Sequence, residues 1–204
     1  MRIKSFTALI MVVLLSLTAM AQESGAPITL DEILKDGTFY EDGITQPTPM
    51  NDGQHYAVIE RGTQIVKYSY KTGKKVATLA TVEQLGDSSI NYFISFKFDR
   101  SESKIIFYTN RQNIYRRSFT ANYYVWDIVA KKLTAVSNDR RQQMATLSPD
   151  GSMVAYVSDN NLYIKRLADG TETQVTTDGL KNSIINGIPD WVYEEEFEYN
   201  RAFC

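Results

Sequence analysis

The chain has 204 residues, a formal net charge of −2 and a single cysteine, Cys204. A protein that binds nucleic acid needs a basic surface, so this balance argues against nucleic acid as a partner. One cysteine cannot form a disulfide within the chain, so stability must come from a hydrophobic core.

The first 21 residues have the pattern of a cleaved export signal. Arg2 and Lys4 give a positive start, an apolar run follows, and Ala19-Met20-Ala21 is the small-x-small pattern that a signal peptidase recognises. The apolar run is shorter than the roughly 20 residues of a spanning helix, although an uncut membrane anchor is the alternative. We therefore expect residues 1–21 to be a signal peptide and the protein to be exported, to the periplasm, the cell surface or the medium.

Residues 22–38 are expected to form an N-terminal segment with one short helix. Thr29 is placed to cap the helix, and Glu32 stands three residues later as its capping-box partner. We expect the helix to end before Gly37.

From residue 39 onward the sequence consists of short alternating runs of β-branched and aromatic residues bounded by turn residues, which predicts strands and hairpins. The runs repeat: Ala57, Ile106 and Ala155 occupy equivalent places, each 49 residues from the next. In each unit a turn and first strand (52–59, 100–108, 148–157) are followed by a second strand (66–70, 123–127, 162–165) and a third (76–79, 133–136, 173–176).

A repeat near 49 residues with three or four strands per unit is typical of a β-propeller, in which each unit is one blade. The alternative is an antiparallel sandwich with accidental spacing. We therefore expect an all-β chain in which residues 39–204 form the first blades of a β-propeller. Known propellers close with roughly four to eight blades, so three units predict a truncated propeller and more of the protein beyond Cys204.

The second unit carries an insertion, 109–122, between its first two strands. Insertions in repeat proteins map to loops, often on the binding face. This one contains Arg111, Arg116 and Arg117 together with aromatic residues. Its composition fits equally well a solvated loop and a loop or extended hairpin that carries an arginine to a site.

Three consecutive glutamates, Glu194, Glu195 and Glu196, lie near the end of the chain. Adjacent like charges repel, so the run indicates either a solvated turn or a site for a cation. Neighbouring residues of a strand point to opposite faces, whereas on a helix they differ by about 100° and can converge on one cation. We therefore expect a short helical turn at about 192–197.

The other residues of this segment are expected to support the helical turn. Trp191 and Tyr193 are expected to anchor it rather than to touch a substrate. Glu194 is expected to make a structural pair, for example with an arginine, or to face solvent.

The segment Asp190-Trp191-Val192-Tyr193-Glu194-Glu195-Glu196 resembles the double-Glu motif of the dipeptidyl peptidase IV family, exported serine exopeptidases of the prolyl oligopeptidase clan. The segment 115–121 is similar to the arginine-bearing segment of that family, with Arg117 in place of a histidine and Phe119 in place of a tyrosine. Segments 28–34, 148–151 and 182–187 also fit this family.

The resemblance implies an eight-bladed propeller followed by a C-terminal α/β-hydrolase domain of the same protein, often as a homodimer and without a cofactor. It implies a serine-type dipeptidyl peptidase that removes Xaa-Pro, or less well Xaa-Ala, dipeptides from peptide substrates with a free N-terminus. On this resemblance Glu195 and Glu196 bind the substrate's free ammonium, and Arg116 contacts a substrate carbonyl.

The sequence lacks the catalytic residues of such an enzyme. A serine hydrolase needs a nucleophile, a histidine base and an orienting acid, and its usual nucleophile motif is Gly-x-Ser-x-Gly. That motif is absent, and the single histidine, His55, lies in a predicted turn. We therefore expect the triad downstream of Cys204 and this chain alone to be inactive.

No group of residues has metal-ligand spacing, and no glycine-rich phosphate loop follows a predicted strand, so no metal or cofactor is expected. The alternative to an exopeptidase is a non-catalytic periplasmic propeller that acts as a binding or scaffold module. A Gly-x-Ser-x-Gly motif in the complete reading frame would favour the exopeptidase.

Overall fold

The computed structural model describes residues 27–40 and 46–203. The chain divides into two compact units, Met1–Gly43 and Ile44–Cys204. The predicted signal peptide, 1–21, lies outside the described residues. Among the residues that are described, no helix is long and apolar enough to cross a membrane.

The first unit contains the predicted N-terminal helix, α2 (Leu30–Leu34). The Thr29 hydroxyl accepts a hydrogen bond from the amide of Glu32, whose carboxylate accepts one from the amide of Thr29 at 2.7 Å. This reciprocal pair satisfies two amides that the first turn of a helix leaves without a partner. The predicted capping box is therefore confirmed.

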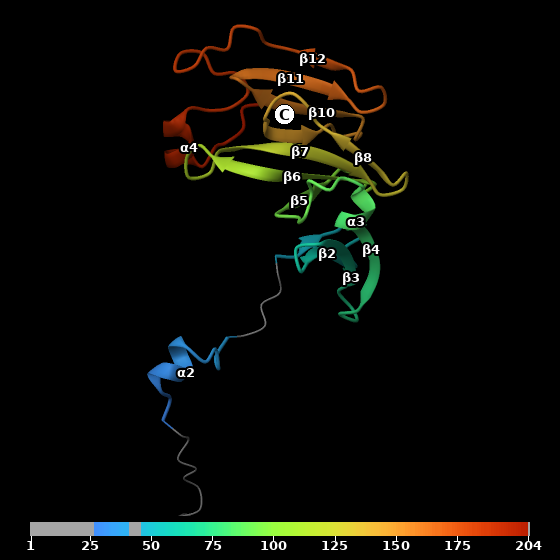
Figure 1. The fold of residues 1–204 in the computed structure, drawn as a ribbon, viewed down its shortest axis with the longest axis vertical. Helices are drawn as coiled ribbons and strands as arrows, with labels where there is room; N and C mark the ends of the chain where they lie inside the picture. Colours follow the sequence, from blue (N-terminus) through green and yellow to red (C-terminus); the bar gives the residue numbers. More distant parts are fainter. Residues whose placement is uncertain (1–26, 41–45, 204) are drawn as a thin grey trace, which may run out of the picture. The chain divides into compact units, whose positions relative to one another are not determined.

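The described part of the second unit contains three four-stranded antiparallel sheets, which we call blades 1, 2 and 3 (Figure 1). In each blade the strands are ordered as they are in the sequence. Blade 1 contains β1 (Thr48–Pro49), β2 (His55–Glu60), β3 (Gln64–Ser69) and β4 (Lys75–Thr81), followed by the short helix α3 (Val82–Leu85). Blade 2 contains β5 (Phe96–Phe98), β6 (Lys104–Asn113), β7 (Phe119–Asp127) and β8 (Lys132–Ala135). Blade 3 contains β9 (Gln143–Leu147), β10 (Met153–Ser158), β11 (Asn161–Arg166) and β12 (Glu172–Gln174).

The 49-residue repeat is structural. Ala57, Ile106 and Ala155 are each the third residue of the second strand of a blade, and their partners on the third strand are Lys67, Val125 and Ile164. The predicted all-β class and partial β-propeller are confirmed. The first strand of each blade was not individually predicted, because β1 and β5 have two and three residues, too few to show an alternating pattern.

The same tight turn joins the first two strands of every blade. Its left-handed position is Gly53 in blade 1, Glu102 in blade 2 and Gly151 in blade 3, with φ of 63°, 57° and 66°. Glycine adopts this conformation without steric cost. Glu102 adopts it too, and its carboxylate accepts a hydrogen bond from the amide of Asn51 in the equivalent turn of blade 1.

The hydrophobic core lies between the blades. Ile105 and Phe107 of β6 belong to a cluster shared with blade 1, whereas Ile106 belongs to a cluster shared with blade 3. Successive strand residues point to opposite faces, so a blade with a neighbour on each side buries consecutive apolar residues. β7 alternates in the same way, with Tyr124 and Trp126 in the first cluster and Tyr123 and Val125 in the second.

Candidate functional site

The acidic run lies on helix α4 (Trp191–Phe197), as predicted, and the helix begins one residue earlier than expected. The Asp190 carboxylate caps it by accepting a hydrogen bond from the amide of Tyr193 at 3.0 Å. The helix ends at Phe197, and its C-cap residue, Glu198, has a left-handed φ of 59°. A single cap residue on each side therefore confines the helix to the segment that carries the glutamates.

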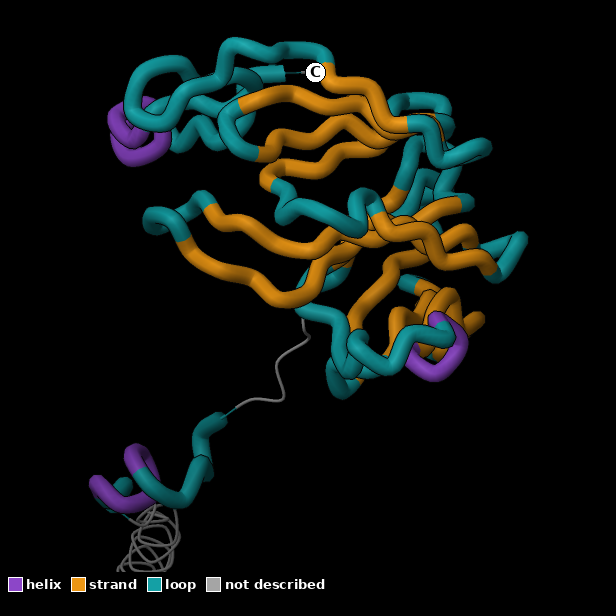
Figure 2. Tube along the Cα trace, turned by 45° about the horizontal axis from the view of Figure 1, so that its top comes forward, coloured by secondary structure: helices purple, strands orange, loops and turns teal. Residues whose placement is uncertain are grey.

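The insertion of blade 2 is an extended hairpin. Strands β6 and β7 pair beyond the blade as far as Asn113 and Phe119, after a shift of register between Thr109 and Gln112. The tip, residues 114–118, lies beside α4 in both views of the fold (Figures 1 and 2). The insertion is therefore an extended hairpin and not an irregular loop.

Arg141, from the segment that leads into blade 3, holds the base of the hairpin. Its guanidinium donates to the Thr120 hydroxyl at 3.0 Å, to the Thr120 carbonyl at 3.1 Å and to the carbonyl of Asn110. Asn110 has a left-handed φ of 52° at the register shift. The sequence offers no signal for this contact because the partners lie in different repeats.

Glu194 joins the helix to the tip of the hairpin. Its side chain is buried, with 3% of the residue exposed, and its Oε1 accepts hydrogen bonds from the amides of Arg117 and Ser118, both at 2.8 Å. Burial alone would raise the pKa of Glu194, but hydrogen bonding by Ser118 and Arg117 outweighs it and holds the pKa below its usual value. The expected structural pair exists, but backbone amides take the place of an arginine side chain.

The two adjacent arginines at the tip contact different glutamates. Nε of Arg116 lies 3.4 Å from Oε2 of Glu195, whereas Nη2 of Arg117 donates to Oε1 of Glu198 at 2.7 Å. The side chain of Arg116 is 73% exposed and that of Glu195 is 15% exposed. The structure thus brings Arg116 together with Glu195, and it engages Arg117 at the end of α4.

Glu196 is exposed next to this pair, and no ion pair of Glu196 is found within the described residues. Trp191 and Tyr193 do not anchor the helix as expected, because each is 52% exposed. The ring of Tyr193 packs against Phe197, also exposed, with centroids 5.6 Å apart. Glu194, the buried residue of α4, provides the attachment instead.

A pocket of about 190 Å³ lies where the hairpin tip meets α4. Tyr115 and Ser118 line it from the tip, and Trp191 and Glu194 line it from the helix. The site therefore combines the partly buried carboxylate of Glu195, the exposed carboxylate of Glu196, the exposed guanidinium of Arg116 and a neighbouring pocket. Such a set can bind a ligand that carries a positive group beside a hydrogen-bond acceptor.

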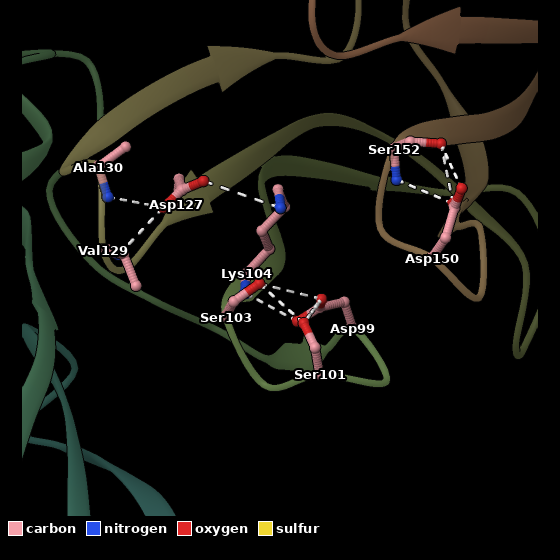
Figure 3. Close-up of polar contacts among 9 residues, drawn as sticks. All are labelled: Asp99, Ser101, Ser103, Lys104, Asp127, Val129, Ala130, Asp150 and Ser152. Atoms are coloured by element: carbon pink, nitrogen blue, oxygen red, sulfur yellow. Dashed lines mark hydrogen bonds and ion pairs between the residues drawn. The ribbon is translucent and has the colours of Figure 1, made fainter.

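Other acidic residues of the blades are occupied by their own turns. Figure 3 shows Asp99, Asp127 and Asp150 at the turns of blades 2 and 3, each accepting hydrogen bonds from nearby residues. Hydrogen bonds from Ser148 and Ser152 lower the pKa of Asp150 to about 2. The donors are Ser101, Ser103 and Lys104 for Asp99, Val129 and Ala130 for Asp127, and Ser148 and Ser152 for Asp150.

His55, predicted to lie in a turn, is instead the first residue of β2 and contacts the turn that precedes this strand. Its Nδ1 lies 2.6 Å from Oδ2 of Asp52, which stands three residues earlier and also accepts hydrogen bonds from the amides of Gln54 and His55. Within the part of the chain that the structure describes, no group of three or more His, Cys, Asp or Glu residues is placed to hold a metal ion. Compared with these turn carboxylates and with His55, the α4–hairpin junction is therefore the stronger candidate for a ligand site.

Comparison with known proteins identifies the family of the chain. Residues 99–204, which include the hairpin and α4, match the family described as "Dipeptidyl peptidase IV (DPP IV) N-terminal region". The chain belongs to the dipeptidyl peptidase IV family. The family resemblance inferred from the acidic and arginine-bearing segments is thereby confirmed.

Individual members of the dipeptidyl peptidase IV family match most of the chain. Human prolyl endopeptidase FAP is 33% identical over 145 residues, which cover 71% of this chain and 19% of that protein. Dipeptidyl-aminopeptidase B of Aspergillus niger is 29% identical over 192 residues, 86% of this chain and 21% of that protein. The crystal structure of Porphyromonas gingivalis dipeptidyl peptidase 4 is similar with a TM-score of 0.74 and 38% identity, over 87% of this chain and 26% of that one. The chain spans about a fifth of the length of the curated relatives that it matches.

Proposed function

We propose that this chain is the substrate-recognition part of an exported serine dipeptidyl peptidase that removes Xaa-Pro, or less well Xaa-Ala, dipeptides from free peptide N-termini. In this proposal Glu195 and Glu196 bind the substrate's ammonium and Arg116 binds a substrate carbonyl. The observation that carries it is the junction of α4 and the hairpin, which places Arg116 beside Glu195 although 79 positions separate them.

The chemistry of a peptide N-terminus matches this junction. The ammonium group and the first carbonyl of a peptide lie within one residue of each other, so a carboxylate and a guanidinium that are close together can bind both. Arg116 and Glu195 form a partly exposed ion pair, and such pairs contribute little to stability. Both groups can therefore turn to a ligand at small energetic cost to the fold.

A charged site of this kind also explains how an exopeptidase measures its distance from the chain end. Carboxylates fixed relative to the nucleophile bind an ammonium only when the scissile bond is two residues away. Hydrogen bonds to charged groups contribute roughly 1.5–3 kcal/mol each. Two such bonds are enough to dominate the choice between a free and an extended N-terminus.

The sequence pattern and the family resemblance support proposals for the rest of the protein. We propose a C-terminal α/β-hydrolase domain that carries the catalytic serine, histidine and acid, so that this chain alone is inactive. We further propose that residues 1–21 are a signal peptide, that 22–38 are an N-terminal segment preceding the blades of 39–204, and that the mature protein is periplasmic, on the cell surface or secreted, as a homodimer.

The proposal is tested by substituting the two glutamates in the full-length protein. Glu195→Gln and Glu196→Gln should each lower kcat/KM for a Gly-Pro-linked chromogenic substrate by about tenfold or more, because each removes a charged partner of the ammonium. Circular dichroism should show that the fold survives. Unchanged activity in both variants would contradict the assignment, and a wild-type protein without cleavage would favour a non-catalytic propeller.

A further inference from the structure

Glu194 binds to the hairpin tip through a buried carboxylate, with 3% of the residue exposed. A buried carboxylate is unfavourable unless hydrogen bonds satisfy it. Here one oxygen, Oε1, accepts from two consecutive amides, those of Arg117 and Ser118, both at 2.8 Å. Charge-assisted hydrogen bonds of this kind are about twice as strong as neutral ones. The contact therefore holds the tip firmly to α4.

The contact between Glu194 and the hairpin tip lies next to the Arg116–Glu195 pair in the sequence. Arg116 directly precedes Arg117 on the hairpin, and Glu195 directly follows Glu194 on the helix. The hydrogen bonds between Glu194 and the tip thus lie one residue away from both members of the Arg116–Glu195 pair. Fixing the backbone at this point fixes the spacing of the two backbone segments from which the guanidinium and the carboxylates extend.

We propose that Glu194 is a positioning residue, whose buried carboxylate holds the hairpin tip against α4 and so sets the spacing between Arg116 and the Glu195–Glu196 pair. This inference rests on the proposed function of those three residues. In this proposal Glu194 binds neither the ammonium nor the carbonyl of the substrate. Its effect on cleavage passes through Arg116 and the two glutamates beside it.

The other contacts of the hairpin are less suited than Glu194 to position its tip. The Arg117–Glu198 pair joins the same two elements, but the side chain of Glu198 is 69% exposed, and exposed ion pairs contribute little. Arg141 holds the hairpin at its base, at Asn110 and Thr120, and leaves the orientation of the tip open.

The test uses two substitutions in the full-length protein. Glu194→Met keeps the length of the side chain but removes the acceptor, and Glu194→Gln keeps an acceptor oxygen without the charge. Glu194→Met should lower kcat/KM for the Gly-Pro-linked chromogenic substrate about tenfold or more, and Glu194→Gln by about two- to fivefold. If Glu194→Met fails to fold, the kcat/KM of Glu194→Gln tests the proposal instead. Wild-type activity in Glu194→Gln would then overturn the proposal.

A double-mutant cycle separates positioning from a general loss of stability. In an Arg116→Ala background the guanidinium that Glu194 positions is already gone. Adding Glu194→Met to this background should therefore lower kcat/KM by less than about threefold. A residue with a merely structural role would cause the same loss in both backgrounds, and that result would overturn the inference. Glu198→Gln is the matched control on the exposed pair and should change activity by less than about twofold.

Hydrogen exchange tests the contact without reference to activity. The amides of Arg117 and Ser118 should exchange faster in Glu194→Met than in wild type, while Glu196→Gln leaves them unchanged. Loss of activity in Glu195→Gln together with wild-type activity in Glu194→Met would overturn the positioning role and leave the proposed function standing. If Glu195→Gln and Glu196→Gln were both fully active, the proposed function and the positioning role would fall together.

Discussion

Glu194, Glu195 and Glu196 are consecutive but differ in environment, because each residue of a helix is turned by about 100° from the last. Glu194 is buried, Glu195 is partly buried and Glu196 is exposed. On a strand, Glu195 would point to the face opposite both neighbours. The helix therefore lets one glutamate attach it to the hairpin while the other two remain accessible to a ligand.

The two arginines at the hairpin tip should differ in their effect on cleavage. Arg116→Ala should lower kcat/KM for a Gly-Pro-linked substrate about tenfold or more, since it removes a charged hydrogen-bond donor. Arg117→Ala should cost less than about threefold, because it removes an exposed pair with Glu198 and keeps the amide that Glu194 binds. Steady-state kinetics of both variants provide the measurement, and equal losses would contradict the assignment of Arg116.

The charge of Glu194 should make the hairpin contact dependent on pH. Its pKa is lowered in the folded protein, so its stabilising contribution is complete above the unfolded value and is lost as the pH falls through the folded value. Protection of the Arg117 and Ser118 amides from exchange should therefore weaken below about pH 4 in wild type relative to Glu194→Gln, which does not titrate. Parallel pH profiles for the two proteins would show that the charge is not involved.

The helix of the acidic run was predictable, because two adjacent side chains can reach one cation from a helix but not from a regular strand. The partner of Glu194 was not predictable. Backbone amides have no sequence signature, and Arg117 lies 77 positions away. The prediction that Trp191 and Tyr193 anchor the helix was wrong. Large aromatic side chains suggest burial, but the buried side chain of this helix is that of the charged Glu194.

At the scale of elements, the repeated turn explains why the blades were recognisable. Asp and Gly tolerate the geometry of a tight turn, so a turn that recurs every 49 residues leaves a visible pattern. The edges of the blades were harder to predict. β9 contains Met144 in a left-handed conformation, with a φ of 55°, which interrupts the regular pairing and its alternating pattern.

Two glycines at equivalent turns should respond differently to the same substitution. Gly53 and Gly151 both have a left-handed φ, so alanine at either position should cost about 1 kcal/mol. A Cβ on Gly151 would also lie 2.9 Å from Oδ2 of Asp99 in blade 2, whereas a Cβ on Gly53 meets nothing within 4 Å. Thermal unfolding should show a larger loss for Gly151→Ala, and equal losses would mean that blades 2 and 3 do not meet closely at this turn.

At the scale of the whole molecule, contacts between blades stabilise the propeller. Blade 2 is covered on both faces, which accounts for the uninterrupted apolar runs of β6 and β7. The buried Trp126 also donates a hydrogen bond from Nε1 to the carbonyl of Leu79 in blade 1 at 3.1 Å. This bond was not predictable, because a sequence repeat indicates that blades exist but not which side chains cross between them.

Replacing this tryptophan should weaken the interface between blades 1 and 2. Trp126→Phe leaves the carbonyl of Leu79 buried without its donor and should lower the free energy of unfolding by about 1–3 kcal/mol. Trp191→Phe is the matched control, because Trp191 is 52% exposed, and it should change stability by less than about 0.5 kcal/mol. Denaturant unfolding of the full-length variants compares the two, and equal effects would exclude a special role of the Trp126 bond.

We propose that the α4–hairpin junction recognises a free peptide N-terminus. The most direct test compares kcat/KM for a Gly-Pro-linked chromogenic substrate with that for its N-acetylated form, in wild type and in the Glu195→Gln/Glu196→Gln double variant. We expect wild type to prefer the free form by about a hundredfold or more, and the double variant to lose nearly all of this preference, because the acetylated substrate has no ammonium to bind. A preference that persists unchanged in the double variant would contradict the claim.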